Sequence, residues 1–296
     1  MIGNRKRLHI AIQKGGRLSE ASRDLLRKAG LRIQSGKNDL TARVENMALD
    51  LMFVRDDDIP TFVCDGVCEF GVVGRNVLEE FGAGVDQPGF EVVAPLGFGR
   101  CALKIAVPEQ SDYSGVASLA GARIATSYPQ LLQRFLNAHG VDAGVVRMSG
   151  AVELAPRLGI ASAVCDLVST GATLEANNLR AVETVLESEA VLIRTTRPME
   201  PEQDVLAGNL LRRIDGVLAT RESKYILMNA PSTALPEISR ILPGAESPTI
   251  VPLHGRPGQF AIHAVCQESV FWETLERLKA AGASAILVMP IEKMML

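Results

Sequence analysis

Small polar residues and one acid are concentrated between Asp166 and Thr173, in the sequence Asp-Leu-Val-Ser-Thr-Gly-Ala-Thr. The apolar run 163–168 predicts a strand covered on both faces, and a helix is expected to start near Ala172. Free amides at a helix start, with hydroxyls and a glycine that permits close approach, can hold a phosphate. A carboxylate at the end of the strand can accept hydrogen bonds from sugar hydroxyls. The spacing therefore favours a phosphorylated sugar as ligand, and a polar turn that only caps its own helix is the alternative.

The same segment resembles the 5-phosphoribosyl-1-pyrophosphate (PRPP) loop of phosphoribosyltransferases. Many such loops carry two adjacent acids, whereas Cys165 precedes the single Asp166 here. This pattern, Asp-Leu-Val-Ser-Thr-Gly-x-Thr-Leu, resembles the ATP phosphoribosyltransferases, the first enzymes of histidine biosynthesis. Further similar segments, spread over nearly the whole chain, indicate the long, regulated form of the family: 13–18, 54–60, 71–80, 123–129 and 284–294.

The resemblance implies a defined reaction, in which N1 of the adenine of ATP attacks C1 of PRPP and displaces pyrophosphate. The product would be 1-(5-phosphoribosyl)-ATP, and the enzyme would be inhibited by histidine. Such a transfer passes through an oxocarbenium-like state, so the protein must align two anionic substrates and neutralise the leaving group. Mg²⁺ is the expected cofactor, held mainly by substrate oxygens and water.

The resemblance also assigns roles to particular residues. Asp166 is expected to contact the ribose hydroxyls and, indirectly, Mg²⁺. Lys14 and Arg17 follow the first strand and are expected to contact the triphosphate or pyrophosphate, although loop cations are often only solvated. The PRPP-binding set is Glu153, Asp166, Ser169, Thr170, Gly171, Ala172 and Thr173, and the ATP-binding set is Lys14, Gly15, Arg17, Arg55 and Gly74. Glu153 is explained equally well as an acid in the first turn of a helix.

Alternating strand and helix patterns predict an α/β catalytic part. Strands are expected at 8–12, 49–54, 69–73, 122–125, 145–148 and 163–168, and helices at 19–28, 76–81, 131–139 and 152–158. Gly97-Phe98-Gly99 superficially matches a nucleotide fingerprint, but a strand at 102–107 follows instead of the required helix, which favours a hinge. Crossings near 97–101 and 178–182 predict one lobe of residues 1–99 and 180–220 and a second of residues 100–179. The resemblance implies a periplasmic-binding-protein-like pair of lobes, with PRPP on the second.

After Arg221, the order β-α-β-β-α-β predicts a ferredoxin-like domain over residues 221–296, with Gly244 and Gly282 at the two helix ends. The resemblance makes this the regulatory domain. Its effector site is expected at Asn229, Ser247 and Thr249, which could otherwise only satisfy strand ends. Asn229 lacks the charge with which an acid would pair with the amino group of L-histidine.

Composition limits the partners. A net charge of −3 and 4% aromatic residues argue against nucleic acid, and the five cysteines are expected to be reduced thiols. No apolar run approaches the ~20 residues of a membrane helix, and no signal segment is expected, which favours the cytoplasm. The resemblance implies a homo-oligomer of dimers that assemble into hexamers. The alternatives are a two-lobed solute receptor fused to a sensing domain and a non-catalytic scaffold.

Overall fold

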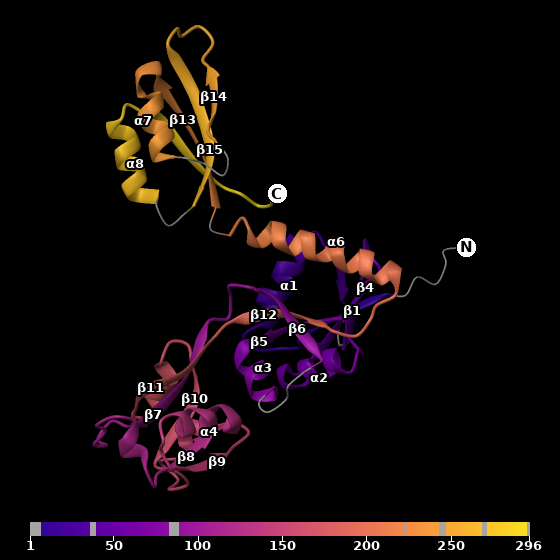
Figure 1. The fold of residues 1–296 in the computed structure, drawn as a ribbon, viewed down its shortest axis with the longest axis vertical. Helices are drawn as coiled ribbons and strands as arrows, with labels where there is room; N and C mark the ends of the chain where they lie inside the picture. Colours follow the sequence, from indigo (N-terminus) through magenta and orange to yellow (C-terminus); the bar gives the residue numbers. More distant parts are fainter. Residues whose placement is uncertain are drawn as a thin grey trace. The chain divides into compact units, whose positions relative to one another are not determined.

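A computed structural model describes residues 7–35, 40–82, 89–221, 223–242, 247–267 and 271–294 (Figure 1). The chain divides into two compact units, residues 1–24 with 31–206 and residues 25–30 with 207–296. Gly244, expected at a helix end, lies outside the described residues. Within the described part, no helix combines the length and apolar character needed to span a membrane.

The first lobe of unit one is built on a mixed sheet whose described strands have the order β2-β3-β4-β1-β5-β12-β6. β1 pairs in parallel with β4 and β5, and β12 runs antiparallel to β5 and β6. The strands are β1 Leu8–Gln13, β2 Ile33–Ser35, β3 Thr41–Val44, β4 Leu49–Val54, β5 Phe70–Gly74, β6 Phe90–Pro95 and β12 Ala190–Thr195, and the helices are α2 Ile59–Cys64 and α3 Arg75–Phe81. Helix α1, Ser19–Lys28, begins in unit one and ends in unit two. β2 and β3 were not expected, because both strands are short and partly polar.

The second lobe of unit one has a sheet with the order β11-β7-β10-β8-β9. Its elements are β7 Cys101–Pro108, β8 Arg123–Thr126, α4 Pro129–Ala138, β9 Gly144–Arg147, β10 Ala163–Val168, α5 Ala172–Ala176 and β11 Leu179–Ser188. Cys165 on β10 packs into one core with Leu132 of α4, whereas Val164 packs into another with Leu174 of α5. β10 is therefore covered on both faces, as its apolar run predicts.

Two expectations about unit one are wrong. Residues 152–158 do not form an α-helix: a short 3₁₀ turn at Val152–Leu154 is followed by turns. Pro156 has no amide hydrogen to donate inside such a helix, which explains the interruption. The second crossing between the sheets lies at Glu189 rather than at 178–182, because β11 pairs with β7 and β12 pairs with β5. The domain boundaries themselves remain predictions.

The ferredoxin-like part of unit two follows α6 (Pro201–Leu218). Its elements are β13 Ser223–Pro231, a 3₁₀ turn Ser232–Ala234, α7 Leu235–Ile241, β14 Thr249–Pro252, β15 Gln259–Gln267, α8 Phe271–Ala280 and β16 Ser284–Pro290. The strands form an antiparallel sheet in the order β14-β15-β13-β16. Alternate residues Ile226 and Met228 face a core that includes Ile238 of α7 and Leu278 of α8. The predicted βαββαβ order is confirmed.

Candidate active site

The loop between β10 and α5 combines a left-handed glycine with several small polar side chains. Gly171 has φ 86° and ψ −12°, a left-handed conformation that glycine adopts without strain, and no side chain caps the start of α5. In the described part of the chain, the hydroxyls of Ser169, Thr170 and Thr173 have no hydrogen-bond partner. No side chain of this turn therefore caps α5, and the three hydroxyls remain available to a ligand.

Asp166 lies half-buried on β10, where the backbone N–H of Leu167 donates to its Oδ1 at 2.8 Å. Loss of solvation raises the pKa of Asp166, the Leu167 amide lowers it, and the negative charge of Glu153 raises it further. The structure thus brings Asp166 and Glu153 together, although Glu153 lies in a 3₁₀ turn rather than in the expected helix.

A pocket of about 600 Å³ adjoins the loop. Ser169, Thr170 and Gly171 form one side of it, and β7 and β11 form much of the rest. Its charged lining residues are Arg100, Lys104, Glu109, Glu175, Arg180 and Glu187. Asp166, Glu153, Ala172 and Thr173 are not among the residues that line it. Lys104 was missed in the sequence, since a single lysine within an apolar strand gives no signal of its own.

A second cavity, of about 440 Å³, lies between the two lobes of unit one. Asp56 and Asp57 from the first lobe line it together with Ser127, Tyr128 and Arg147 from the second. Desolvation and the negative charges of Asp56 and Asp166 raise the pKa of Tyr128. Tyr128 is therefore close enough to Asp56 in the first lobe and to Asp166 on β10 for the charges of both carboxylates to affect it.

Asn76 connects the two lobes at this cavity. Its Nδ2 donates to the Tyr128 hydroxyl at 2.9 Å, and its Oδ1 accepts from Ser188 Oγ at 2.8 Å. Asn76 is only 2% exposed, so these bonds satisfy a buried amide. Sequence reasoning missed Asn76 and Tyr128 as site residues, although Ser127-Tyr128-Pro129 lies in a segment that carries the family resemblance.

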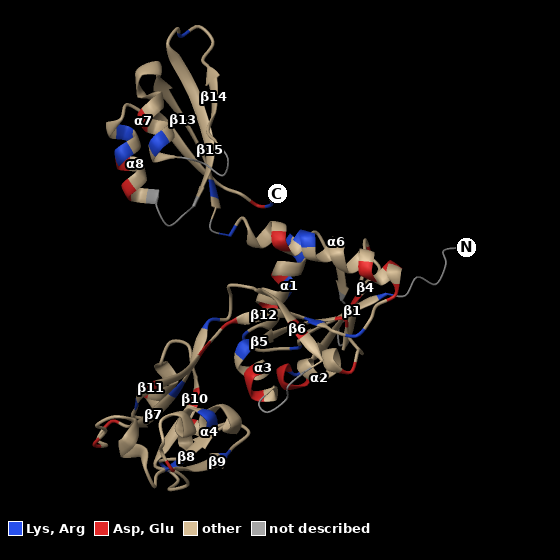
Figure 2. Ribbon diagram, viewed as in Figure 1, with Lys and Arg blue, Asp and Glu red and all other residues tan. Residues whose placement is uncertain are grey.

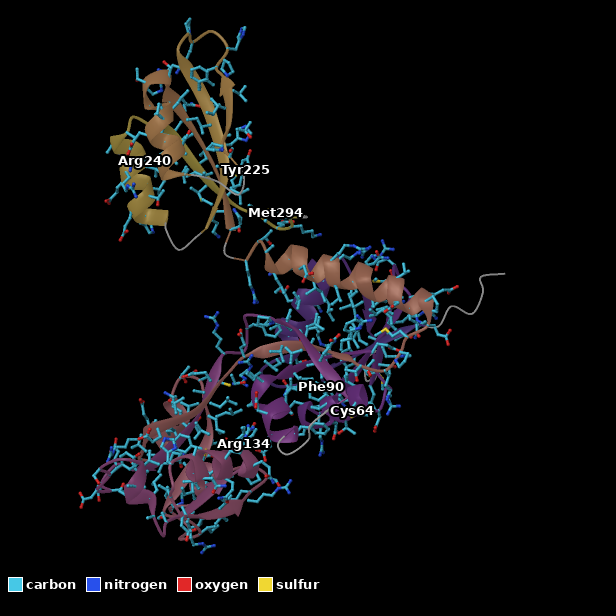
Figure 3. All side chains as sticks on the ribbon, in the orientation of Figure 1. Cys64, Phe90, Arg134, Tyr225, Arg240 and Met294 are labelled. Atoms are coloured by element: carbon cyan, nitrogen blue, oxygen red, sulfur yellow. The ribbon has the colours of Figure 1, made fainter. Side chains whose placement is uncertain are left out.

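Helix α3 of the first lobe also contacts the start of α4 in the second. Glu80 accepts the backbone N–H groups of Gln130 and Leu131, both at 2.9 Å. Beside it, Arg134 Nη2 lies 3.1 Å from Glu79 Oε2. Figure 2 colours acidic positions on α3 and a basic position on α4, and Figure 3 labels Arg134. Since Tyr128 provides no side-chain cap, Glu80 caps α4 from the other lobe.

The predicted ATP-binding residues lie at or after the carboxyl ends of the central strands β1, β4 and β5 of the first sheet. Lys14 follows β1 and donates its backbone N–H to Val54 O at 2.8 Å, which brings Lys14 next to Arg55 at the end of β4. Gly74 ends the neighbouring strand β5. Lys14, Gly15, Arg17 and Arg55 are all exposed, and none of them lines either cavity. The structure brings these residues together but does not join them to the loop at 169–173.

The predicted effector residues are in unit two. Asn229 on β13 pairs with Ala261, and Thr249 on β14 pairs with His263, so both side chains point away from α7 and α8. Ser247 is exposed before β14. His263 also hydrogen-bonds to the Tyr225 hydroxyl and was not selected from the sequence. The structure therefore adds an imidazole beside Thr249 on this face.

The fold and site define a class of proteins: a two-lobed, periplasmic-binding-protein-like α/β part with a phosphate-type loop on its second lobe, followed by a ferredoxin-like domain. A family model described as ATP phosphoribosyltransferase matches residues 55–216, and one described as the C-terminal domain of HisG matches residues 220–293. The chain belongs to the ATP phosphoribosyltransferase family, which carries out the first step of histidine biosynthesis, and the family expected from the loop is confirmed.

Two relatives illustrate the match. The ATP phosphoribosyltransferase of Maricaulis maris (strain MCS10) is 53% identical over 290 residues, covering 98% of this chain and 99% of the relative. Among solved structures, the ATP phosphoribosyl transferase (HisG:HisZ) complex from Thermotoga maritima is similar with a TM-score of 0.60 and 24% identity, over 71% of this chain and 97% of that one. The second comparison supports the fold.

Proposed function

We propose that this protein joins ATP to PRPP, giving 1-(5-phosphoribosyl)-ATP and pyrophosphate. The bond between C1 of the ribose and the pyrophosphate oxygen breaks, and a bond forms between C1 and N1 of adenine. The observation that carries the proposal is the loop from Asp166 to Thr173. Gly171 is left-handed, the loop hydroxyls have no hydrogen-bond partner within the described residues, and a cavity of about 600 Å³ adjoins the loop. Family membership supports the same reaction.

In this proposal, the loop residues 169–173 hold the 5-phosphate and Asp166 accepts hydrogen bonds from the ribose hydroxyls. Lys14, Gly15, Arg17, Arg55 and Gly74 serve the triphosphate or the leaving pyrophosphate. The carboxylate of Asp166 is partly shielded from water. A hydrogen bond from a ribose hydroxyl, or an attraction to a positive charge on the ligand, would therefore be stronger there than in bulk water. The lone pair of adenine N1 can attack without prior removal of a proton.

Mg²⁺ is the proposed cofactor, and the donors present fit it. The neighbouring carboxylates of Asp166 and Glu153 are hard oxygen ligands with excess negative charge. Among the described residues, no group of three or more His, Cys, Asp or Glu side chains could hold a metal ion. The two carboxylates therefore fit an Mg²⁺ ion whose remaining ligands would be substrate oxygens and water. When bound, the ion would neutralise charge on the pyrophosphate.

The reaction can be followed by the change in ultraviolet absorbance as the adenine is modified, with pyrophosphatase present to pull the equilibrium. An Mg²⁺-dependent adduct that requires both ATP and PRPP is expected. Absence of any adduct would refute the proposed function. Absence of heat on titration with PRPP would favour a receptor for another solute.

Two substitutions test the assigned site. Asp166→Ala and Thr170→Ala are each expected to lower turnover by about 10²–10³-fold, because each removes a contact that stabilises charge. Thr196→Ala, at an exposed threonine outside the site, is the matched control, and circular dichroism checks folding. Unchanged kinetics in both site variants would place the PRPP site elsewhere.

The proposal extends to regulation and setting. L-histidine would bind at the face of unit two that carries Asn229, Ser247 and Thr249, and would inhibit through a coupling of about 1–3 kcal/mol. The enzyme would act in the cytoplasm as a homo-oligomer, a dimer or a hexamer. An exposed sheet edge in the ferredoxin-like part offers one route to subunit contact.

A further inference from the structure

Lys104 lies in the middle of β7, with apolar residues on either side of it in the chain. Leu103 and Ile105 point into the core that contains α4, so Lys104 points to the opposite face of the sheet. There it lines the pocket of about 600 Å³ together with Ser169, Thr170 and Gly171. The side chain is half-buried, and among the described residues its ammonium group has no hydrogen-bond or ion-pair partner.

The strand register places Lys104 directly opposite Asp166. Opposing residues in an antiparallel pair share a face, with Cβ atoms about 4.5–5.5 Å apart. The two side chains nevertheless form no ion pair, and Asp166 instead interacts with the Leu167 amide and the charge of Glu153. An ion pair with Asp166 therefore does not explain the lysine at this position. Its ammonium group is available to a ligand in the pocket beside the loop.

The remaining charges in the pocket are arranged for a ligand with both acceptors and donors. The guanidinium of Arg180 is engaged, since its Nη2 donates to Ser111 O at 2.8 Å, and Arg100 is exposed where the chain enters β7. Glu109, Glu175 and Glu187 add acceptors. A phosphorylated sugar presents anionic oxygens to the lysine and the loop hydroxyls, and sugar hydroxyls to carboxylates.

We propose that Lys104 is a further substrate-binding residue, whose ammonium group donates to an oxygen of the 5-phosphate of PRPP held by Ser169, Thr170 and Gly171. This inference rests on the proposed function and adds to it a cation, from the neighbouring strand, that the loop itself lacks. Phosphate held by hydroxyls and amides alone keeps its full charge, whereas a lysine neutralises part of it at close range.

The test is steady-state kinetics of Lys104→Met, with Lys104→Arg to retain the charge. Lys104→Met is expected to raise the KM for PRPP about 10- to 100-fold, the usual effect of losing a charged hydrogen bond. The KM for ATP and kcat should change less than about threefold. The lysine would bind the 5-phosphate equally in the ground state and in the transition state, so its loss weakens PRPP binding without slowing the bound complex. Lys104→Arg should recover most of the affinity. Arg123→Met removes an exposed charge on the same lobe, outside the pocket, and should leave all constants unchanged.

Competition by fragments identifies which phosphoryl group is bound. The inhibition constant of ribose 5-phosphate should rise in Lys104→Met by the same factor as the KM for PRPP, whereas that of pyrophosphate should stay constant. A rise for pyrophosphate alone would overturn the assignment to the 5-phosphate. If Lys104→Met is unstable by thermal denaturation, Lys104→Gln provides the same loss of charge with a polar chain.

The outcomes separate this inference from the function on which it rests. A wild-type protein that forms the adduct, with an unchanged KM for PRPP in Lys104→Met, would refute the role of Lys104 alone. A wild-type protein that neither forms the adduct nor binds PRPP would refute both.

Discussion

The pKa of Asp166 depends on its burial and on the neighbouring charge of Glu153. Burial raises the pKa of Asp166, and the nearby negative charge of Glu153 raises it further. If the carboxylate form of Asp166 binds the ribose, activity should fall on acidification at a pH above the ordinary range of aspartate, since protonation removes an acceptor.

Glu153→Gln is therefore expected to shift the acid limb of the kcat/KM profile for PRPP to lower pH. Removing a like charge favours the ionised form of Asp166 and lowers its pKa. The ionisation of PRPP itself is the same with both enzymes, so a difference between their profiles reports the protein. Asp112→Asn, at an exposed acid of the second lobe that lines neither cavity, serves as control. An acid limb that moves upward, or does not move, would contradict the prediction.

At the scale of elements, the two lobes of unit one are connected through α3 and α4. Glu80 caps α4 with two hydrogen bonds, whereas the neighbouring pair Glu79–Arg134 is largely exposed. A cap is worth about 0.5–2 kcal/mol, but an exposed ion pair typically contributes about 0–1 kcal/mol. The cap should therefore matter more than the ion pair to the local stability of α4.

Glu80→Ala should make the amides of Gln130 and Leu131 exchange with solvent about 5- to 30-fold faster, as expected for a local loss of about 1–2 kcal/mol. Glu79→Ala is the matched control on the same helix, and its effect on these two amides should be small. Hydrogen exchange followed by mass spectrometry or NMR provides the measurement. Equal effects of the two substitutions would show that α4 does not depend on the cap.

At the scale of the whole molecule, each unit has cores of its own. The ferredoxin-like core contains Ile226, Met228, Ile238, Ile262 and Leu278, all at most 1% exposed, while the loop at 169–173 belongs to unit one. Separate cores allow the two units to fold with considerable independence.

Deletion of residues 222–296 is therefore expected to retain adduct formation and to abolish inhibition by histidine. Turnover with and without histidine measures both properties, and gel filtration shows whether assembly has changed. Retained inhibition in the truncated protein would place the effector outside the ferredoxin-like domain. Loss of activity with an altered assembly would show that the ferredoxin-like domain supports catalysis through oligomerisation.

Local patterns in the sequence were sufficient to predict β10, the loop at 169–173 and the βαββαβ order of the C-terminal part. Apolar period, turn residues and helix starts each depend on neighbours within a few positions, and these features also carried the resemblance to the family. The helix predicted at 152–158 is wrong because Pro156 cannot donate an amide hydrogen inside it.

The sequence by itself determined the loop's donors, the fold class and the family. Only the tertiary structure decided that Lys104 lies opposite Asp166 and that Asn76 hydrogen-bonds to Tyr128. The same is true of the cap that Glu80 provides for α4 and of the crossing between sheets at Glu189. Each of these depends on strand register or on contacts between segments about fifty or more residues apart. Such contacts are set by how the sheets and helices pack, which short-range sequence patterns do not encode.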